Sequence, residues 1–245
     1  MVGAALLAAR AALQSGAGRV YAALLSDAAP SVDLCFPEIM LRTPDTLSKL
    51  AQLNAVVIGP GLGQEDIAME LLALWLKQPI PMLLDADALN LIAAHADLSE
   101  ITQKRQAETV ITPHPGEASR LLNTSTSHIQ NNRIECALAL ARSLHATCVL
   151  KGAATVCAHH DGRYFINTTG NPALASGGTG DVLSGAIGSL MAQGLSGFDA
   201  AKLGVFVHGA AADALVARGV GPIGLTASEV AHEIRNEINQ LNENS

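Results

Sequence analysis

The stretch AVVIGPGLGQEDIAMELLALWLKQPIPMLLDADALN, residues 55–90, decides the fold. Its first five residues, AVVIG, form a short apolar run that predicts a strand buried on both faces. The glycine-rich GPGLGQ leads into a helical pattern from about Glu65 to Leu76, and Pro79 and Pro81 then break the chain before a second predicted strand, MLLDADAL. A strand, a helix and another buried strand in this order indicate a parallel β-α-β unit.

The same alternation continues on both sides of this unit. Before it, we predict a helix over residues 2–15, which Gly16 and Gly18 terminate, and a strand over 19–25. After it, strands are predicted over 109–113, 147–152, around Val156 and over 164–166, and helices over 116–122, 127–145, 180–193, 198–217 and 226–241. No linker or repeat divides the chain. We therefore predict a single α/β domain over residues 1–245, with a mostly parallel central sheet covered by helices on both faces.

Composition narrows the class of function. The 245 residues are 49% hydrophobic and 15% charged, which excludes a disordered chain and requires a large buried core. One Trp, two Tyr and four Phe are too few for a base-stacking platform, and the formal net charge of −7 repels phosphate backbones, so we expect no nucleic-acid partner. No uninterrupted apolar run approaches the ~20 residues that cross a membrane, so no membrane span is predicted either.

Two further signals favour the cytoplasm. The opening MVGAALLAARAAL lacks a basic leading region and carries Arg10 in its middle, so we interpret it as a helix rather than a targeting signal. Cys35, Cys136, Cys148 and Cys157 form no CxxC pair and have no histidine at zinc-finger spacing. We expect them to be small buried hydrophobic side chains in a reducing compartment, with no metal site among them.

The segment GNPALASGGTGDVLSGAIGSLMAQG, residues 170–194, carries the strongest functional signal. Gly177, Gly178 and Gly180 let the backbone approach a ligand closely, and the amides at the start of the following helix form an anion site suited to a phosphate. Asp181 lies at that helix end, where we expect the helix dipole to keep its carboxylate ionised and able to accept a proton from a substrate hydroxyl. Helix capping is the alternative role for this aspartate.

Two loops after predicted strands leave a structural alternative open. GPGLG, residues 59–63, is either a loop that approaches a ligand closely or a tight turn, and its spacing does not fit the dinucleotide-binding GxGxxG. DADALN, residues 85–90, offers carboxylates for a magnesium-bound phosphate or a substrate hydroxyl, with Asp85 the favoured residue. The alternative for this second loop is helix capping by Asp87 or Asn90.

In two more loops the structural alternative is the favoured one when each loop is taken alone. In TPHPGE, residues 112–117, prolines fix the backbone around His114, and Glu117 follows, although a lone loop histidine is usually a surface residue. KGAAT, residues 151–155, either grips nucleotide phosphates or forms a hairpin with an exposed lysine. The remaining histidines at 159, 160, 208 and 232 have no ligand-like partners in the sequence, and we interpret them as surface or core residues.

Taken in order, VVIGPGLGQ, LLDADALN, VITPHPGEASRLL, VLKGAATV and GNPALASGGTGDVLSG resemble the ADP- or ATP-dependent NAD(P)H-hydrate dehydratase family, a branch of the ribokinase-like superfamily. The resemblance spans nearly the whole chain, and five motifs in one order are far more specific than any single motif. It implies a ribokinase-like three-layer α/β/α fold. It also implies repair of damaged nicotinamide cofactor, in which the S epimer of hydrated NADH or NADPH (NADHX or NADPHX) is dehydrated with consumption of ADP or ATP and with Mg²⁺. Phosphorylating the ring hydroxyl turns a poor leaving group into phosphate, which the lone pair of the ring nitrogen can expel.

The resemblance also implies roles for individual residues. Asp181 would be the base that deprotonates the ring hydroxyl, and Gly178, Thr179 and Gly180 would stabilise the transferring phosphoryl group. The residues implied at the hydrated nicotinamide nucleotide are Ala4, Gly63, His114 and Asp181. Those implied at the adenine nucleotide are Lys151, Gly152, Ala153, Ala154, Thr155 and Gly180, with Glu117 close to magnesium.

The resemblance departs at the amino end. Members of the family begin with an additional strand and a glycine-rich turn before the helix MVGAALLAARAAL, so we expect a sheet that lacks its first strand and a chain that is shortened at its amino end. The resemblance further implies a homotetramer and an NAD(P)H-hydrate epimerase as functional partner. The alternatives are a ribokinase-like kinase of a small alcohol, of the hydroxymethylpyrimidine or hydroxyethylthiazole type, and a nucleotide-binding module without activity.

Overall fold

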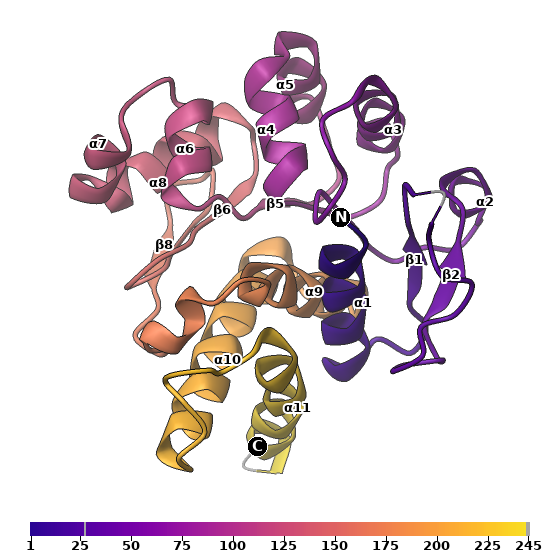
Figure 1. The fold of residues 1–245 in the computed structure, drawn as a ribbon. Helices are drawn as coiled ribbons and strands as arrows, with labels where there is room; N and C mark the ends of the chain where they lie inside the picture. The colour runs from indigo at the N-terminus through magenta and orange to yellow at the C-terminus, as the bar shows by residue number, and fades with distance from the viewer. Residues whose placement is uncertain (27, 244–245) are drawn as a thin grey trace.

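The computed structural model describes residues 1–26 and 28–243. The strands are β1 (Tyr21–Ala23), β2 (Met40–Arg42), β3 (Val56–Ile58), β4 (Met82–Leu84), β5 (Thr109–Ile111), β6 (Thr147–Leu150), β7 (Val156–Ala158) and β8 (Tyr164–Ile166). The helices are α1 (Val2–Gln14), α2 (Pro44–Ser48), α3 (Asp66–Leu76), α4 (Ala86–Ala94), α5 (Ala96–Gln103), α6 (Pro115–Leu121), α7 (Thr126–Asn131), α8 (Arg133–Ser143), α9 (Thr179–Ala192), α10 (Gly197–Ala217) and α11 (Ala227–Glu243). A short 3₁₀ helix, η1 (Pro172–Ala175), precedes α9. Figure 1 shows three layers, with α3 to α8 on one side of the central sheet and α1 and α9 to α11 on the other, as the sequence predicts.

The central sheet has six strands in the order β3-β4-β5-β6-β7-β8. The strands from β3 to β6 are parallel, and β7 and β8 are antiparallel to their neighbours. Successive residues of a strand face opposite layers: Met82 and Leu84 pack with α3 to α8, whereas Leu83 packs with α9 and α10. All three side chains are fully buried, which explains why these strands are apolar throughout.

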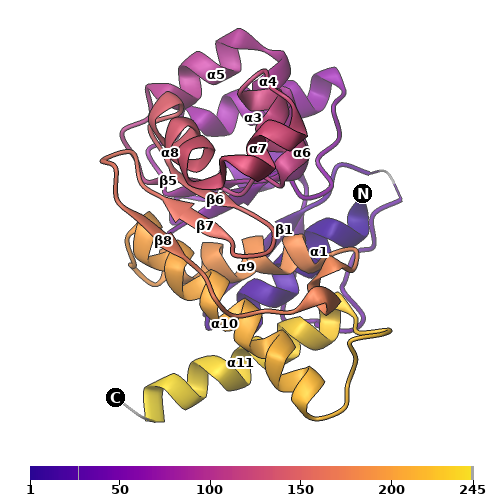
Figure 2. The same ribbon diagram turned by 90° about the vertical axis from the view of Figure 1, so that its left-hand side faces the viewer.

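The layer that contains α1 depends on close backbone contact between helices. A Cβ atom at Gly185 of α9 would overlap the carbonyl oxygen of Ala8 in α1. On another face of α9, a Cβ atom at Gly204 of α10 would overlap Ile187. The three helices therefore approach more closely than larger side chains allow, and Figure 2 shows them side by side beneath the sheet.

β1 and β2 lie outside the central sheet, which differs from the single sheet predicted. They pair in parallel with each other, from Tyr21 opposite Met40 to Ala23 opposite Arg42. β3 is therefore an end strand of the six-stranded sheet. Val56 and Val57 of this strand are only partly buried, whereas the residues of β4 are fully buried. β2 and α2, in a segment that we predicted to be irregular, were missed from the sequence.

Other predicted elements differ in detail. The strand expected over MLLDADAL ends at Leu84, and α4 begins at Ala86, because Ala and Asp favour a helix start over an extended strand. α5 was not predicted. The helix expected over 127–145 divides into α7 and α8 at Asn132, whose φ of −131° and ψ of 45° are not helical. The expectation that all four cysteines are buried is wrong for Cys35, which is exposed.

One helix has the length and apolar character of a membrane span, although no such span was predicted. α10 is long and apolar enough to cross a membrane by length and composition, with a mean hydropathy of 1.3. However, 56% of the apolar 18-residue part of this helix is buried inside the protein. Residues such as Val205 and Ala201 pack beneath the sheet there. This burial is that of a core helix.

Candidate functional site

The carboxyl ends of β4 and β6 bring a carboxylate and an ammonium group together. Asp85 follows β4 and Lys151 follows β6, and Lys151 Nζ lies 2.7 Å from Asp85 Oδ1. The other carboxylate oxygen of Asp85 accepts a hydrogen bond of 2.7 Å from Ser184 Oγ in α9. Asp85 and Ser184 are almost completely buried, so the serine fixes the orientation of the carboxylate that binds the lysine.

Glu117 lies on the other side of Lys151. It occupies the first turn of α6, is buried, and its Oε2 atom is 4.0 Å from Lys151 Nζ. Burial raises the pKa of Glu117, with Lys151 opposing that effect. Burial also acts to lower the pKa of Lys151, but the carboxylates of Asp85 and Glu117 more than offset it, and the pKa is raised. The lysine therefore stays charged in a nearly closed site.

His114 is the capping residue of α6. Its Nδ1 atom accepts hydrogen bonds from the amides of Gly116 and Glu117, while the Glu117 carboxylate accepts one from the His114 amide. The side chain of His114 is half exposed. The structure thus gives the histidine a capping role, and its Nε2 atom lies 3.4 Å from Glu117 Oε1.

The glycine loop before α9 completes the site. Gly178 is the N-cap residue of α9 and has a φ of +88°, a left-handed conformation that favours glycine. A Cβ atom at Gly180 would lie 3.4 Å from Lys151 Nζ, so the lysine faces the first turn of α9. The amino end of a helix and a buried ammonium group converge here, which is the electrostatic arrangement that attracts a phosphate.

Asp181 lies in the first turn of α9 and points toward the same groups. Burial, followed by repulsion from Asp85, raises its pKa to about 6, although Lys151 opposes the rise. We expected the helix end to favour the ionised form, so the direction of this shift is the opposite of that expectation; burial and the neighbouring carboxylates outweigh the dipole. Within residues 1–26 and 28–243 the Asp181 side chain caps no helix and has no hydrogen-bond partner. Its carboxylate is therefore available to accept a proton near neutral pH.

Thr179 and His208 stabilise the start of α9. The Thr179 hydroxyl donates to the backbone carbonyls of Leu174 and Ser176, at 2.7 and 2.9 Å, so only its amide is left for a ligand. His208 is buried, as a core histidine was predicted to be, and its Nε2 lies 3.0 Å from the carbonyl oxygen of Thr179. Because that carbonyl can only accept, Nε2 carries the proton; burial lowers the pKa of His208 to about 4, so the ring is neutral.

The GPGLG loop is attached to the residues after β4. A Cβ atom at Gly59 would overlap the carbonyl oxygen of Asp85, and the Gly63 amide donates to Asp87 Oδ2 at 2.8 Å. Asp87 therefore fixes this loop and does not cap α4. Ala4 is buried on α1, and no described contact connects it with Asp181.

The KGAAT turn separates into an inner and an outer part. Lys151 points inward, whereas Gly152, Ala153 and Ala154 are exposed beyond the carboxyl end of β6. The Thr155 hydroxyl closes the turn by donating to the carbonyl of Gly152 at 2.8 Å. Ala154 has a φ of +51°, an unusual conformation for a residue with a side chain. A strained, exposed turn next to a buried lysine is typical of a binding loop.

The structure thus unites Asp85, Glu117, Lys151, Gly180 and Asp181, and connects Gly63 through Asp87. Sequence reasoning missed Ser184 and His208 as supports of this site. Ser184 could have been found from its position three residues after Asp181, on the same face of the helix. His208 had no local signal.

Comparison with known proteins decides the family. A family model described as NAD(P)H-hydrate dehydratase matches residues 1–236. This chain belongs to the NAD(P)H-hydrate dehydratase family. The family expectation from the sequence is therefore confirmed, and with it the reaction class of a hydro-lyase.

Relatives of this dehydratase are similar over nearly all of its length. The ADP-dependent (S)-NAD(P)H-hydrate dehydratase of Neisseria meningitidis serogroup B is 42% identical over 238 residues, which are 96% of this chain and 80% of the relative. The bifunctional NAD(P)H-hydrate repair enzyme Nnr of Escherichia coli is 42% identical over 240 residues, which are 97% of this chain but only 45% of that enzyme. This chain thus spans less than half the length of its bifunctional relative.

A solved structure confirms the fold. The ADP/ATP-dependent NAD(P)H-hydrate dehydratase of Bacillus subtilis, co-crystallized with ATP/Mg²⁺ and soaked with CoA, is similar with a TM-score of 0.86 and 31% identity, over 98% of this chain and 87% of that chain. The similarity covers all three layers of the dehydratase and therefore includes the strands and helices that carry the Asp181 cluster.

Proposed function

We propose that this chain dehydrates the S epimer of hydrated NADH or NADPH, using ADP or ATP as the phosphoryl donor. The observation that supports the proposal best is Asp181, whose carboxylate has a pKa of about 6, no hydrogen-bond partner among the described residues, and a position at the start of α9 beside Lys151. A base with a pKa just below neutrality is ionised at working pH and still able to accept a proton.

The chemistry follows from the positions of these groups. Asp181 takes the proton of the ring hydroxyl while the hydroxyl oxygen bonds to the terminal phosphorus of the nucleotide, and the bond from that phosphorus to the bridging oxygen breaks. The amides of Gly178, Thr179 and Gly180, together with Lys151, stabilise the negative charge on the transferring group. The lone pair of the ring nitrogen then expels phosphate, and loss of a ring proton restores the reduced nicotinamide.

Magnesium fits this site through the nucleotide. Among the described residues, no group of three or more His, Cys, Asp or Glu side chains is arranged to hold a metal ion. A magnesium ion that keeps several waters and binds substrate phosphates needs only one or two carboxylates, and Glu117 lies at the right place to be one of them. When bound, the ion supplies charge neutralisation on the phosphates.

The remaining assignments extend this proposal to the ligands. Gly152, Ala153, Ala154 and Thr155 would contact the adenine nucleotide, because they form the exposed turn next to Lys151. Gly63 and the half-exposed ring of His114 would contact the hydrated nicotinamide nucleotide, with Ala4 as a further contact from α1. The names of the relatives support both ADP and ATP as donor.

We also propose a cytoplasmic homotetramer that acts after an NAD(P)H-hydrate epimerase. The bifunctional name of the Escherichia coli relative supports the epimerase as partner. For the assembly, Ile67 and Leu74 of α3 lie seven residues apart on one helix face and are 61% and 45% exposed. These two exposed apolar side chains support packing between subunits.

The experiment compares the chain with its Asp181→Asn variant. With hydrated NADH, ADP and Mg²⁺, the wild-type chain should regenerate the absorbance of NADH, and the variant should lose about 10²–10⁴-fold in kcat while still binding ADP. Accumulation of a stable phosphorylated alcohol without that absorbance would instead indicate a small-alcohol kinase. Equal turnover by the two chains, both binding ADP, would leave a nucleotide-binding module without catalysis.

A further inference from the structure

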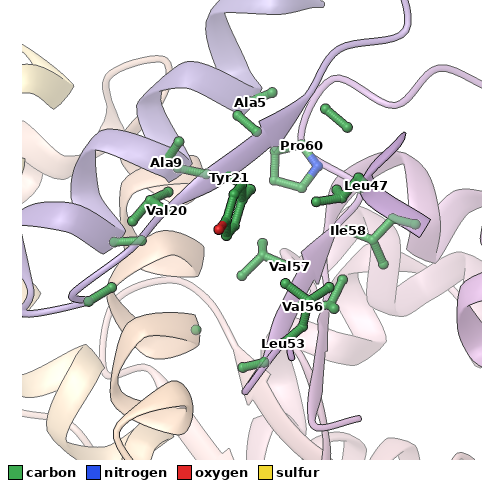
Figure 3. Close-up of a pocket in the computed structure, with 18 of the residues that line it drawn as sticks. Ala5, Ala9, Val20, Tyr21, Leu47, Leu53, Val56, Val57, Ile58 and Pro60 are labelled. Carbon is green, nitrogen blue, oxygen red and sulfur yellow. The ribbon is translucent and has the colours of Figure 1, made fainter. Parts of the chain in front are cut away.

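The large cavity of this molecule does not contain the Asp181 cluster. It has a volume of about 640 Å³ and lies beside β3, and none of Asp85, Lys151 and Asp181 lines it. Figure 3 shows apolar side chains such as Val56 and Val57 around it. The phosphates of a nucleotide therefore need a different binding surface, and the exposed turn after β6 is the one that lies next to Lys151.

Arg133 reaches the start of that turn from α8. It is the first residue of α8 and follows Asn132, at which the backbone leaves the helical conformation. Its Nη2 atom donates to the carbonyl oxygens of Leu150 and Lys151, at 2.9 and 3.3 Å. The break between α7 and α8, which the sequence did not predict, therefore places a guanidinium group at the carboxyl end of β6.

The same guanidinium group also borders the turn itself. A Cβ atom at Gly152 would lie 3.2 Å from Nη1 and 3.3 Å from Nη2 of Arg133. Nη1 also donates to Gln130 Oε1 of α7, at 3.0 Å. Because α7, the end of β6 and the turn all contact one planar group, the orientation of that group is fixed.

The charge of Arg133 is not neutralised by the protein. Within the described residues, its hydrogen bonds go to backbone carbonyls and a glutamine side chain, and its buried Nε atom has no partner. Burial lowers the pKa of Arg133, and no carboxylate opposes that effect. A partly buried cation without a counter-charge is costly unless an anion binds close by. The phosphates of a nucleotide on the adjacent turn would supply that anion.

The bond to the carbonyl of Lys151 sets the direction of the next amide. In a planar trans peptide the carbonyl and the following N–H point in opposite directions, so the Gly152 N–H faces away from Arg133. Gly152, Ala153 and Ala154 are exposed, and in the part of the chain that the structure describes their amides have no hydrogen-bond partner. Free amides beside a residue with a positive φ, here Ala154 at +51°, form a concave surface that binds anions.

We propose that Arg133 is a positioning residue for the adenine nucleotide. By binding the carbonyl of Lys151 it turns the free amides of the KGAAT turn toward the ligand, and its unpaired charge attracts the phosphates. This inference rests on the proposed assignment of the turn to the nucleotide. Arg105 is a natural contrast, because it is buried before the amino ends of β4 and β5, far along the sheet from this turn. Its guanidinium also binds backbone carbonyls, those of Leu76, Gln78 and Ile80.

The experiment measures the Kd of Mg·ADP by titration calorimetry, without hydrated NADH, so that the result does not depend on catalysis. Arg133→Met should raise this Kd about 10–100-fold, as for the loss of a charged hydrogen bond. Arg133→Lys keeps the charge and can donate to the same carbonyls, so it should recover part of the affinity, about threefold or more. Arg105→Met is the matched control: it should lower the Tm but leave the Kd unchanged.

Turnover provides a second readout. With hydrated NADH, the KM for ADP should rise in Arg133→Met by the same factor as the Kd, while the KM for hydrated NADH stays within about twofold of wild type. A Kd of the folded Arg133→Met that equals the wild-type value would overturn the proposal. An equal rise in Arg105→Met would also overturn it, since the loss would then follow from stability alone. A wild-type chain that binds ADP without regenerating NADH would contradict the proposed dehydration, and the Kd values would still decide the role of Arg133.

Discussion

At the scale of single residues, Asp181 sets the acid side of the pH dependence. Its pKa is raised to about 6, chiefly by burial, and the base must be ionised to act. We expect kcat/KM to fall about tenfold for each pH unit below about 6 and to be level above it. The raised pKa also makes stability depend on pH. Because the folded state holds the proton of Asp181 more tightly than the unfolded state does, the free energy of unfolding decreases as the pH rises from the ordinary pKa of 3.8 to about 6. A kcat/KM profile that is flat from pH 5 to 8 would contradict this role.

Asp85 affects catalysis through the two groups that it faces. Asp85→Asn removes the negative charge that repels the ionised form of Asp181 and also loosens Lys151. The acid limb of kcat/KM should therefore move to lower pH, while kcat at neutral pH falls about 10–100-fold because the lysine is no longer held at its position. Asp87→Asn is the matched control. Asp87 raises the pKa of Asp181 less than Asp85 does, and it accepts a hydrogen bond from the Gly63 amide. In this variant the acid limb of kcat/KM should therefore move less. An unchanged limb in Asp85→Asn would exclude the electrostatic coupling.

The sequence predicted which residues lie at this site better than it predicted how they interact. The loop after a buried strand pointed to Asp85, because the carboxyl ends of parallel strands meet at one edge of a sheet, and the family resemblance pointed to Glu117 and Lys151. The direction of the pKa shift of Asp181 could not be predicted from the helix end alone. It depends on burial and on three carboxylates that are distant in sequence.

At the scale of elements, the contact between α1 and α9 is the most sensitive to side-chain size. Gly185→Ala would place a methyl group against the Ala8 carbonyl, so the helices must separate. We expect the free energy of unfolding in urea to fall by about 1–3 kcal/mol, as for other overpacked sites. Gly3→Ala is the control, because nothing lies within 4 Å of a Cβ at that position of α1, and it should stabilise the protein by about 0.5–1 kcal/mol through helix propensity. A neutral Gly185→Ala would show that the helices are free to move apart.

Elements with strong apolar patterns were predicted well, and short ones were not. The long helices α9, α10 and α11 agree with the prediction within two residues, because their length averages over local preference. α4 was absorbed into a predicted strand, since its first residues continue the sequence of β4 without a proline or glycine. The division of the sheet between β1 and β3 depends on pairing across the chain, which local pattern does not report.

At the scale of the molecule, the nucleotide should connect the two helical layers. The site takes Glu117 from α6 on one side of the sheet and Gly180 from α9 on the other. Mg·ADP at 100 times its Kd should therefore stabilise the folded state by about 2.7 kcal/mol and raise the Tm by roughly 5–10 °C. Lys151→Met should lose most of that shift because the ammonium group at Gly180 is gone. An equal shift in both proteins would mean that the nucleotide binds elsewhere.

The contact between Ala8 of α1 and Gly185 of α9 also bears on the order in which the protein folds during its synthesis, because α1 can pack only once α9 has been made. The ribosome produces α1 long before its partner α9, which is complete only after residue 192. At about 5–20 residues per second, the apolar face of α1 waits roughly 10–35 s for that partner. The layer of α3 to α8 and its strands can pack during this interval, so the nascent chain acquires one half of its core well before the other. A ribosome-bound chain of this protein therefore offers chaperones one defined target, the uncovered face of α1.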